Sequence, residues 1–480
     1  MQYDFFILSA IFVPLLGALL LPAAGYVSAR LRNLLALALI LVSLVCSLKL
    51  LVPALAGKVI TIDARMMLGF SFSFAADGLA VFMACTSSFI SAIIAFYSFS
   101  YISHYENQNE YYCMIVLFVG AMMGLVFSQS LILLYVFWEI TAITSWRLIG
   151  FFRERPFVVK ADKAFLVTVF GALMMLLGFI MIYQQTGSFD LGVIKQQAAV
   201  TPVPDIAVAL ILIGILSKSA TLPFHTWLPD AGVAPSPVTA FLHAAVLVKI
   251  GVYVFARLFL STFTVSQIWY TVVPVVAAAS ALVSAAAALV ETDIKRIIAY
   301  STISQIGFIF FGLSTGNRIG VEGAVLFILM HGLAKAGLFL CAGIIEQNTK
   351  IRDITRMGGL IRTMPVTAIS FLFCAFSVMG LPPFGGFFSK YLVFAGAVKG
   401  GQIAIGFVFL AGAFLTILYL LRLFNMVFMG EARQVSPKEG SVSMVACVAA
   451  LAVFSLIGGI LVAYPSLFIQ VVVRPMLGVA

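Results

Sequence analysis

The sequence predicts an all-α polytopic membrane protein with about fourteen transmembrane helices and two inverted five-helix repeats, each containing a broken helix. Hydrophobic residues make up 63% of the chain and charged residues 10%, whereas soluble domains carry roughly 25% charged residues. Apolar runs long enough to cross a bilayer recur from end to end, and prolines interrupt two of them. This composition excludes a soluble enzyme, a nucleic-acid-binding domain and a disordered tail.

The expected spans follow one another with short connections, which leaves no room for an extramembrane domain. We expect them at residues 4–24, 33–53, 77–102, 112–128, 130–150, 163–184, 206–228, 236–259, 267–290, 295–314, 322–345, 366–400 (interrupted), 403–428 and 444–470. The first run follows an acidic residue, Asp4, and lacks a clear cleavage site, so we expect a retained helix rather than a signal peptide. The connections 58–76 and 186–204 are the longest.

Basic residues gather in three connections, after the first, fifth and eleventh spans. They are Arg30 and Arg32, then Arg153, Arg155, Lys160 and Lys163, and finally Lys350, Arg352, Arg356 and Arg362. Cytoplasmic connections are enriched in Lys and Arg, so these three are predicted to be cytoplasmic and both termini to lie on the outer side. The net charge of +10 is therefore attributed to topology and not to nucleic-acid binding.

Two spans contain proline-rich interruptions, with Pro223 and Pro229 in the seventh and Pro382 and Pro383 in the twelfth. Proline has no amide hydrogen, so Pro223 should free the carbonyl of Ser219. Unpaired backbone is tolerated at membrane depth only against protein or a watery cavity. Broken helices five spans apart run in opposite directions, which indicates an inverted repeat of the transporter type. The alternative is two unrelated proline kinks.

Ionisable side chains occur within the apolar runs, where each is costly and needs a reason. They are Glu139, Lys218, Lys249, His331, Lys335 and Lys390, with His225 and His243 in or beside spans. Lys249 and Lys390 could instead extend to the headgroups, and Glu139 and Lys218 could form a purely structural ion pair. The functional interpretation is a lateral line of groups through the bilayer.

Such a line suits proton transfer, because burial disfavours the charged lysine while a nearby carboxylate favours it. Histidine can carry protons at physiological pH, and Tyr300, Ser301 and Ser304 could hold a chain of water molecules. A sodium site is less well supported, because hard cations prefer several oxygen ligands and Glu139 is the one clear deep carboxylate. Six scattered cysteines and the lack of nucleotide or haem motifs predict no cofactor, no metal and no electron transfer in this chain.

Several motifs together resemble one known family. They are Phe137-Trp138-Glu139, Leu148–Phe151, Lys218-Ser219-Ala220, Leu222–Ala231, Ala234–Val238, His243-Ala244-Ala245, Val248–Tyr253, Asp293–Arg296, Ala299–Gln305, His331–Ala336 and Gly380–Phe387. This ordered set is similar to the antiporter-like membrane subunits shared by respiratory complex I, Mrp sodium/proton antiporters and energy-converting membrane hydrogenases of the formate hydrogenlyase type. The likeness runs from about residue 70 to residue 430.

The resemblance implies three N-terminal helices (1–111), a first inverted repeat (112–260, spans four to eight), a second (261–430, spans nine to thirteen) and a C-terminal helix (431–480). It implies that Glu139 pairs with Lys218, that Lys249 and Lys335 lie on the central axis, and that Lys390 is its terminal group. Two positions depart from some family members: Lys390, where certain complex I subunits have Glu, and Arg147, where an apolar residue is usual.

We therefore expect a proton-translocating subunit of a redox-driven complex, of the complex I or hydrogenase type, in a bacterial or archaeal cytoplasmic (inner) membrane. Its expected partners are lipid, other membrane subunits including further antiporter-like ones, and peripheral subunits that hold iron–sulfur and other redox centres. The alternative is a subunit of an Mrp-type cation/proton antiporter, driven by an ion gradient without redox chemistry. A proton-conducting subunit for inorganic-carbon uptake and an inactive spacer are further alternatives.

Overall fold

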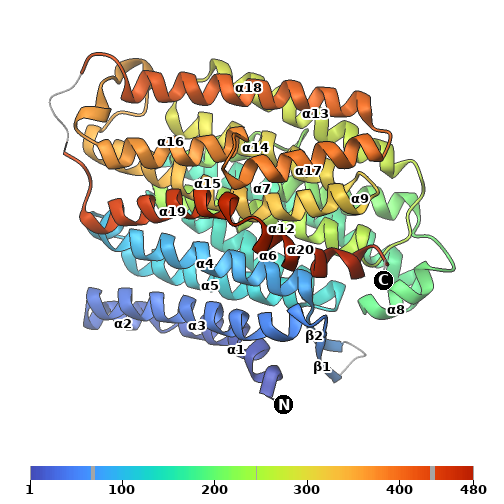
Figure 1. Ribbon diagram of the computed structural model, residues 1–480. Coiled ribbons are helices and arrows are strands. Elements are labelled where there is room, and N and C mark those ends of the chain that lie inside the picture. Colours follow the sequence, from blue (N-terminus) through green and yellow to red (C-terminus); the bar gives the residue numbers. More distant parts are fainter. Residues whose placement is uncertain (1, 66–70, 245, 433–437, 479–480) are drawn as a thin grey trace.

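The computed structural model describes residues 2–65, 71–244, 246–432 and 438–478, and the chain is a bundle of helices that run mostly side by side (Figure 1). Within these residues, 11 helices are long and apolar enough to cross a membrane, or 12 if the bent pair at the N-terminus counts as one span. The polytopic helical fold is thus confirmed. Ala245, in the motif that begins at His243, lies outside the described residues.

The first part of the chain, residues 2–198, begins with helices that form the lower layers in Figure 1. Its elements are α1 (Gln2–Ala18), α2 (Leu21–Val27), α3 (Ala29–Leu55), β1 (Ile60–Arg65), β2 (Ser71–Ala76), α4 (Gly78–Tyr101), a 3-10 turn (Ile102–His104), α5 (Gln108–Phe127), α6 (Leu131–Ile149), α7 (Arg155–Thr186) and α8 (Leu191–Ala198). The expected first span bends by 51° between α1 and α2. The strands pair antiparallel, with Ile60 opposite Ala76, a hairpin that the sequence analysis does not predict.

The rest of the chain completes the bundle with both interrupted and continuous helices. Its elements are α9 (Asp205–Lys218), α10 (Trp227–Asp230), a 3-10 turn (Ala231–Val233), α11 (Ser236–Ala244), α12 (Leu247–Phe255), a π-helical turn (Ala256–Leu260), α13 (Trp269–Val290), α14 (Ile294–Leu313), α15 (Arg318–Thr349), 3-10 turns (Ile354–Arg356 and Leu360–Arg362), α16 (Pro365–Met379), α17 (Gly385–Lys399), α18 (Ile403–Phe428), α19 (Val442–Ile460) and α20 (Ala463–Met476). The segment expected at 444–470 is two helices, and the one at 236–259 divides between α11 and α12.

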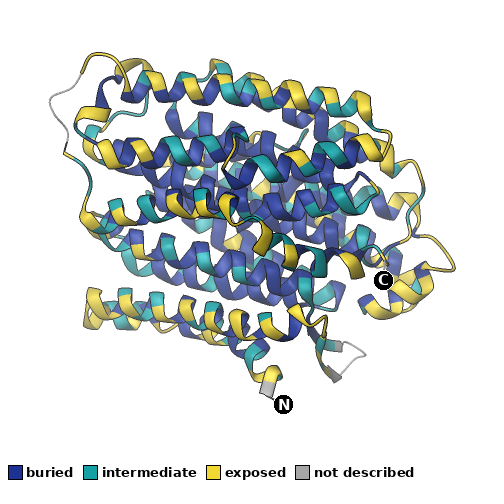
Figure 2. Ribbon diagram, viewed as in Figure 1, coloured by how far each residue is buried: buried dark blue, intermediate teal, exposed yellow. Residues whose placement is uncertain are grey.

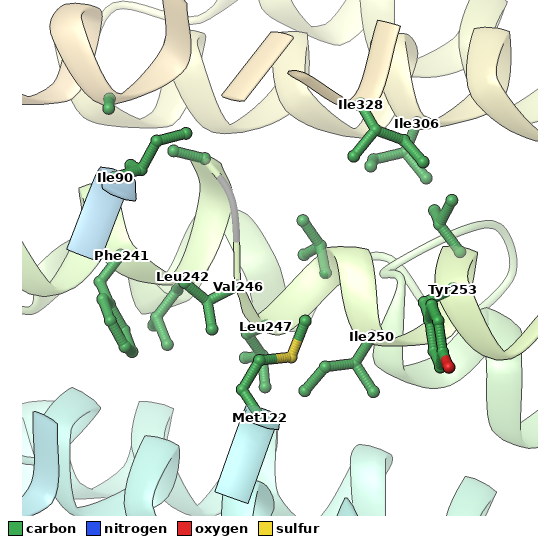
Figure 3. Packing of buried hydrophobic residues seen from close by; sticks show 14 of the residues in the cluster. Ile90, Met122, Phe241, Leu242, Val246, Leu247, Ile250, Tyr253, Ile306 and Ile328 are labelled. Carbon is green, nitrogen blue, oxygen red and sulfur yellow. The ribbon is translucent and has the colours of Figure 1, made fainter. Parts of the chain in front are cut away.

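Helices α11, α12 and α15 form the centre of the bundle, because nearly all their described residues are buried (Figure 2). Apolar side chains pack in this region, among them Met122 on α5, Leu247 on α12 and Ile328 on α15 (Figure 3). Helices α3 and α18 lie at the periphery and expose many apolar residues, as lipid-facing helices do. Polar groups within the buried stretches of these three helices are therefore remote from bulk water.

The first broken span ends α9 at Lys218 in a tight turn. Ala220 has a left-handed φ of 51°. The amide of Thr221 donates to the carbonyl of Leu216 (2.9 Å), and that of Phe224 donates to the carbonyl of Thr221 (2.8 Å). Pro223 lies inside this turn, where a missing amide hydrogen costs no helical hydrogen bond.

The second broken span repeats this geometry between α16 and α17. Gly380 has a left-handed φ of 83°. The amide of Leu381 donates to the carbonyl of Phe376 (3.1 Å), and that of Phe384 donates to the carbonyl of Leu381 (3.0 Å). The two turns therefore share their hydrogen-bond pattern, although a glycine replaces the alanine. Pro382 and Pro383 lie inside the second turn, and the Leu222-Pro223 and Pro382-Pro383 peptides are both cis.

The three basic connections meet at one end of the bundle. Polar contacts near that end are Arg32–Asn109, Glu110–Arg153, Lys163–Asp230, Arg296–Asp230 and Arg352–Asp293. The opposite end carries the hairpin, α8 and α20, and α1 contacts the hairpin through Phe12 and Phe72. The basic connections and the two chain termini thus lie at different ends (Figure 1).

Candidate functional site

Glu139 and Lys218 lie near one another at the start of the proposed line. Lys218 is fully buried at the end of α9, and its ammonium donates to the carbonyl of Trp138 (3.2 Å) and lies 5.2 Å from the centre of the Trp138 ring. Glu139 and Lys218 interact electrostatically, but no direct ion pair joins these two described residues. One Glu139 oxygen is buried without a hydrogen-bond partner. The carboxylate is therefore available to a proton or to a group that is not part of this chain.

Lys249 and His331 form a buried contact between the two halves of the chain. The Lys249 Nζ lies 2.7 Å from the His331 Nδ1, and both side chains are fully buried. A charged ammonium and a charged imidazolium are both donors only, so they could not form this hydrogen bond. At least one of the two groups is neutral, and one proton can shift between two nitrogens across this contact.

Lys335 begins a chain of hydroxyl groups. Its ammonium donates to the Ser301 hydroxyl (2.6 Å) and to the carbonyl of Ile298 (3.1 Å). The hydroxyl of Tyr419 on α18 donates to the same Ser301 oxygen (2.7 Å) and lies 3.4 Å from the Thr416 hydroxyl. This arrangement extends the polar line from α15 across α14 to α18.

Lys390 is held by the broken end of α16. Its ammonium donates to the carbonyls of Val378 (2.8 Å) and Met379 (3.5 Å), and it lies 4.7 Å from the centre of the Phe308 ring. Helix C-terminal carbonyls carry partial negative charge, so the broken helix stabilises the buried ammonium. Met379 lies four residues before Pro383, at the position whose carbonyl a proline leaves without its helical donor.

His243, Lys249, His331, Lys335 and Lys390 form one electrostatically connected group, which we call the buried cationic cluster. The imidazole of His331 interacts electrostatically with the three lysines of this cluster and with His243. Both nitrogens of His243 are buried without a hydrogen-bond partner. These positions come from α11, α12, α15 and α17, so only the folded bundle brings them together.

Several of the expected site residues lie apart from this cluster. His225 is half-buried in the first break and feels the charge of Lys163 at the basic end. Tyr300 faces Arg296, whose guanidinium lies 5.8 Å from its ring centre. Pro229 lies in the first turn of α10, where proline is tolerated.

The remaining expected positions keep local contacts. The Ser304 hydroxyl is buried without a partner. Arg147 pairs with Glu110 at 2.5 Å, so its charge is compensated at the basic end and not by Glu139. Outside the spans, burial raises the pKa of Glu291, but hydrogen bonds from Arg296 and two backbone amides leave that pKa below its usual range.

The sequence analysis assigns no role to Trp138, Gln305, Thr416 or Tyr419, although the first two lie in the motifs named there. The Gln305 amide donates to the Thr416 hydroxyl (3.2 Å). Thr416 and Tyr419 are three residues apart and share a helix face. Two polar residues at this spacing in an apolar run were the feature of the sequence that could have indicated their role.

Among the described residues, no three His, Cys, Asp or Glu side chains gather as a metal site.

A polytopic bundle with two matching helix breaks and a buried line of lysines and histidines has the construction of an antiporter-like membrane protein. A sequence model of the NADH:quinone oxidoreductase/Mrp antiporter membrane family matches residues 128–416. The chain belongs to this family.

Curated relatives cover most of this chain. It is 31% identical over 97% of its length to the A1 subunit of a Na(+)/H(+) antiporter of Staphylococcus aureus. It is 37% identical over 76% of its length to the corresponding Na(+)/H(+) antiporter subunit of Alkalihalophilus pseudofirmus. The chain spans 62% and 49% of these relatives, respectively.

Two solved structures share the fold. A chain of the Mrp complex from Dietzia sp. DQ12-45-1b superposes with a TM-score of 0.90 at 24% identity, covering 98% of both chains. A chain of the membrane-bound sulfane sulfur reductase, an archaeal respiratory membrane complex, superposes with a TM-score of 0.91 at 23% identity, covering 98% of this chain and 97% of that one.

Proposed function

We propose that this chain is the proton-conducting, antiporter-like subunit of a multisubunit Mrp-type cation/proton antiporter. The observation that carries the proposal is the 2.7 Å contact between Lys249 and His331, inside a cluster that continues to Lys335 and Lys390. Buried lysines and histidines that share protons suit proton transfer better than they suit binding of a hard cation, which needs oxygen ligands.

The relatives support this function over the redox-driven one that the sequence analysis placed first. Both curated relatives described above are subunits of Na(+)/H(+) antiporters. Their identity to this chain exceeds that of the solved structures, whose likeness concerns the fold alone. The substrate cation and the whole assembly are proposals, because the chain spans less than two thirds of these relatives.

A redox-driven complex remains the second candidate. The observation in its favour is that a chain of an archaeal respiratory complex has the same fold. In that case the buried cationic cluster would perform the same proton transfer, and partner subunits with redox centres would supply the energy.

We propose fourteen membrane crossings for the bundle, counting each interrupted helix as one. The shared hydrogen-bond pattern of the two breaks supports inverted repeats at 112–260 and 261–430, flanked by 1–111 and 431–480. The clustering of basic connections at one end supports a cytoplasmic position for that end. Both termini would then lie on the outer side of the membrane.

A further membrane protein of the same complex is proposed to cover the face of α6 around Glu139. Tyr135 and Glu139 are only partly buried, and Val136 and Ile143 on the same helix are 46% and 49% exposed. A carboxylate that faces lipid at mid-membrane is costly, so a partner with a polar or basic group is the more stable neighbour.

Purification of the intact complex in mild detergent, followed by mass spectrometry, separates the two candidates. The proposal expects several small membrane subunits and no iron–sulfur protein. Stoichiometric recovery of redox subunits would overturn the Mrp-type assignment in favour of the second candidate.

The conducting role is tested in proteoliposomes that contain the complex and a pH-sensitive dye. Lys218→Ala should lower proton movement by about tenfold or more, because it removes a proton-binding group from the line. The control is Lys399→Ala, which removes an exposed lysine at the end of α17. Equal rates for both variants and the native complex would contradict the role of Lys218.

A further inference from the structure

A buried ion pair lies where α11, α14 and α15 meet at the basic end of the bundle. The Lys295 side chain is 1% exposed, and its Nζ lies 2.5 Å from an oxygen of Glu346. The same ammonium donates to the carbonyl of Ala234 (3.0 Å). The Glu346 side chain is 23% exposed, so this carboxylate reaches both the aqueous end and the interior.

Glu346 is also bonded to the first turn of α11. The Ser236 hydroxyl donates to the Glu346 Oε2 (3.1 Å), and the Tyr101 hydroxyl lies 3.4 Å from the Ser236 oxygen. Gly343 permits this contact, since a Cβ added there would lie 2.6 Å from the Ser236 Cβ. Helices α11 and α15 therefore approach closely at the position where the carboxylate meets the hydroxyl.

A face of α11 leads from this contact towards the buried cationic cluster. Ser236, Thr239 and His243 follow one another at the spacing of one helix face, over about 10 Å, and all three are fully buried. The His243 ring packs 4.5 Å from that of Phe339 on α15, and its nitrogens have no partner. His243 also feels the charge of Lys335.

We propose that Glu346 is the proton acceptor at the mouth of a relay that runs through Ser236 and Thr239 to His243 and so supplies the buried cationic cluster from the basic end. This inference rests on the proposed proton-conducting function. A proton binds a Glu346 oxygen and weakens the attraction of that carboxyl for Lys295. Hydroxyl groups and intervening water then pass one proton to a nitrogen of His243, and Glu346 returns to the carboxylate form.

The charges around Glu346 keep it available for this step. Lys295 and Arg352 face it from α14 and from the connection after α15, with Arg352 at 3.9 Å. Asp293 pairs with Arg352 at 2.9 Å and competes for that guanidinium. Lys295 and Arg352 together stabilise the ionised form of Glu346, which is the form that accepts a proton. When Glu346 is protonated, Arg352 keeps Asp293 as its partner.

Transport measurements on the purified complex test the relay with two variants. Thr239→Val removes the central hydroxyl but keeps the shape of the side chain and the ion pair. Glu346→Gln removes the acceptor. We expect each to lower proton movement into proteoliposomes about tenfold. Thr168→Val, at a buried α7 threonine that bonds backbone carbonyls, and Glu322→Gln, at a carboxylate paired with Arg318, should stay within about twofold of the native rate.

A second measurement does not depend on transport. Acid-minus-alkaline infrared difference spectra of the native complex should contain a carboxyl band that disappears in Glu346→Gln and persists in Glu322→Gln. Absence of a Glu346-dependent band would overturn the proposal, as would a native transport rate in an assembled Thr239→Val complex. If the native complex exchanges no cation for protons, the proposed function fails, and the infrared band still decides whether Glu346 carries a proton.

Discussion

At the scale of single residues, the four buried lysines of the line are held by three kinds of partner. Lys218 and Lys390 bind backbone carbonyls, Lys249 binds an imidazole nitrogen, and Lys335 binds a hydroxyl. Backbone carbonyls accept hydrogen bonds but release no proton, whereas imidazole and hydroxyl groups can do both. The centre of the line is therefore better suited to pass protons than its two ends, where a charge is held in place.

Ser301→Ala tests the hydroxyl link at Lys335. The substitution leaves the Lys335 ammonium with the Ile298 carbonyl and removes the connection to Tyr419. Hydrogen bonds to charged groups contribute about 1.5–3 kcal/mol, so we expect proton movement to fall by about tenfold or more. The measurement is dye-reported proton movement in proteoliposomes. Ser88→Ala, at a buried serine bonded to the Ala84 carbonyl, is the control, and an unchanged rate in Ser301→Ala would contradict the link.

At the scale of elements, the helix breaks depend on close backbone packing. A Cβ added at Gly386, in the first turn of α17, would lie 1.7 Å from the carbonyl oxygen of Ser377 on α16. No side chain fits at that distance, so a substitution there must displace the two half-helices. The breaks position Lys218 and Lys390, which makes their geometry part of the conducting line.

Gly386→Ala should therefore lower the thermal unfolding temperature of the complex and reduce proton movement together. We expect a loss of about 1–3 kcal/mol, as for overpacked sites. Gly406→Ala on α18 is the control, because an added Cβ there would have its nearest contact at 3.8 Å. A Gly386→Ala protein as stable as Gly406→Ala would show that the break tolerates displacement.

A second element-scale contact joins the start of α4 to the end of the span that contains α12. Asp77 caps α4 through the Ala80 amide and pairs with both terminal nitrogens of the buried Arg257. Removal of one partner of a buried pair leaves an uncompensated charge and costs about 3–5 kcal/mol.

Asp77→Asn should thus lower the unfolding temperature clearly, as measured by fluorescence-monitored heating of the purified complex. Glu106→Gln removes an exposed carboxylate near the other end of α4 and should have little effect. Equal unfolding temperatures for the two variants would mean that Arg257 finds another partner when Asp77 is replaced.

At the scale of the whole molecule, the conducting line runs from a partly exposed carboxylate on α6 to a buried lysine on α17. The partly exposed end needs a neighbour in the membrane, and the proposed assembly with further subunits supplies one. Because the line reaches the surface of the chain, we propose that this protein works as part of a complex.

Cross-linking tests this arrangement. Val136→Cys, near Glu139 on the exposed side of α6, should form a cross-link to a partner protein when the membrane is treated with a short thiol-reactive linker. Phe414→Cys, on the exposed side of α18, is the control, and it shows whether any exposed cysteine on this chain forms a cross-link. A Val136→Cys protein that links to nothing, in a complex shown to be intact, would contradict a partner at this face.

The helical membrane fold and the identities of the buried ionisable residues could be predicted from the sequence alone. Long apolar runs require helices in a bilayer, the prolines of two runs indicate their interruptions, and a charge in an apolar run is visible without coordinates. The hairpin after α3 could not be predicted in this way, because it depends on packing against neighbouring helices.

Only the tertiary structure decided which of these residues meet. Lys249 reaches His331, and Ser301 joins Lys335 to Tyr419, across helices far apart in the sequence. His225 and Tyr300 are the same residue types as His331 and Tyr419, but they lie near Lys163 and Arg296 at the basic end. Hydropathy and the positions of prolines are local properties of the chain, so they can be read from the sequence. Proton transfer depends on side-chain contacts between helices, which only packing creates.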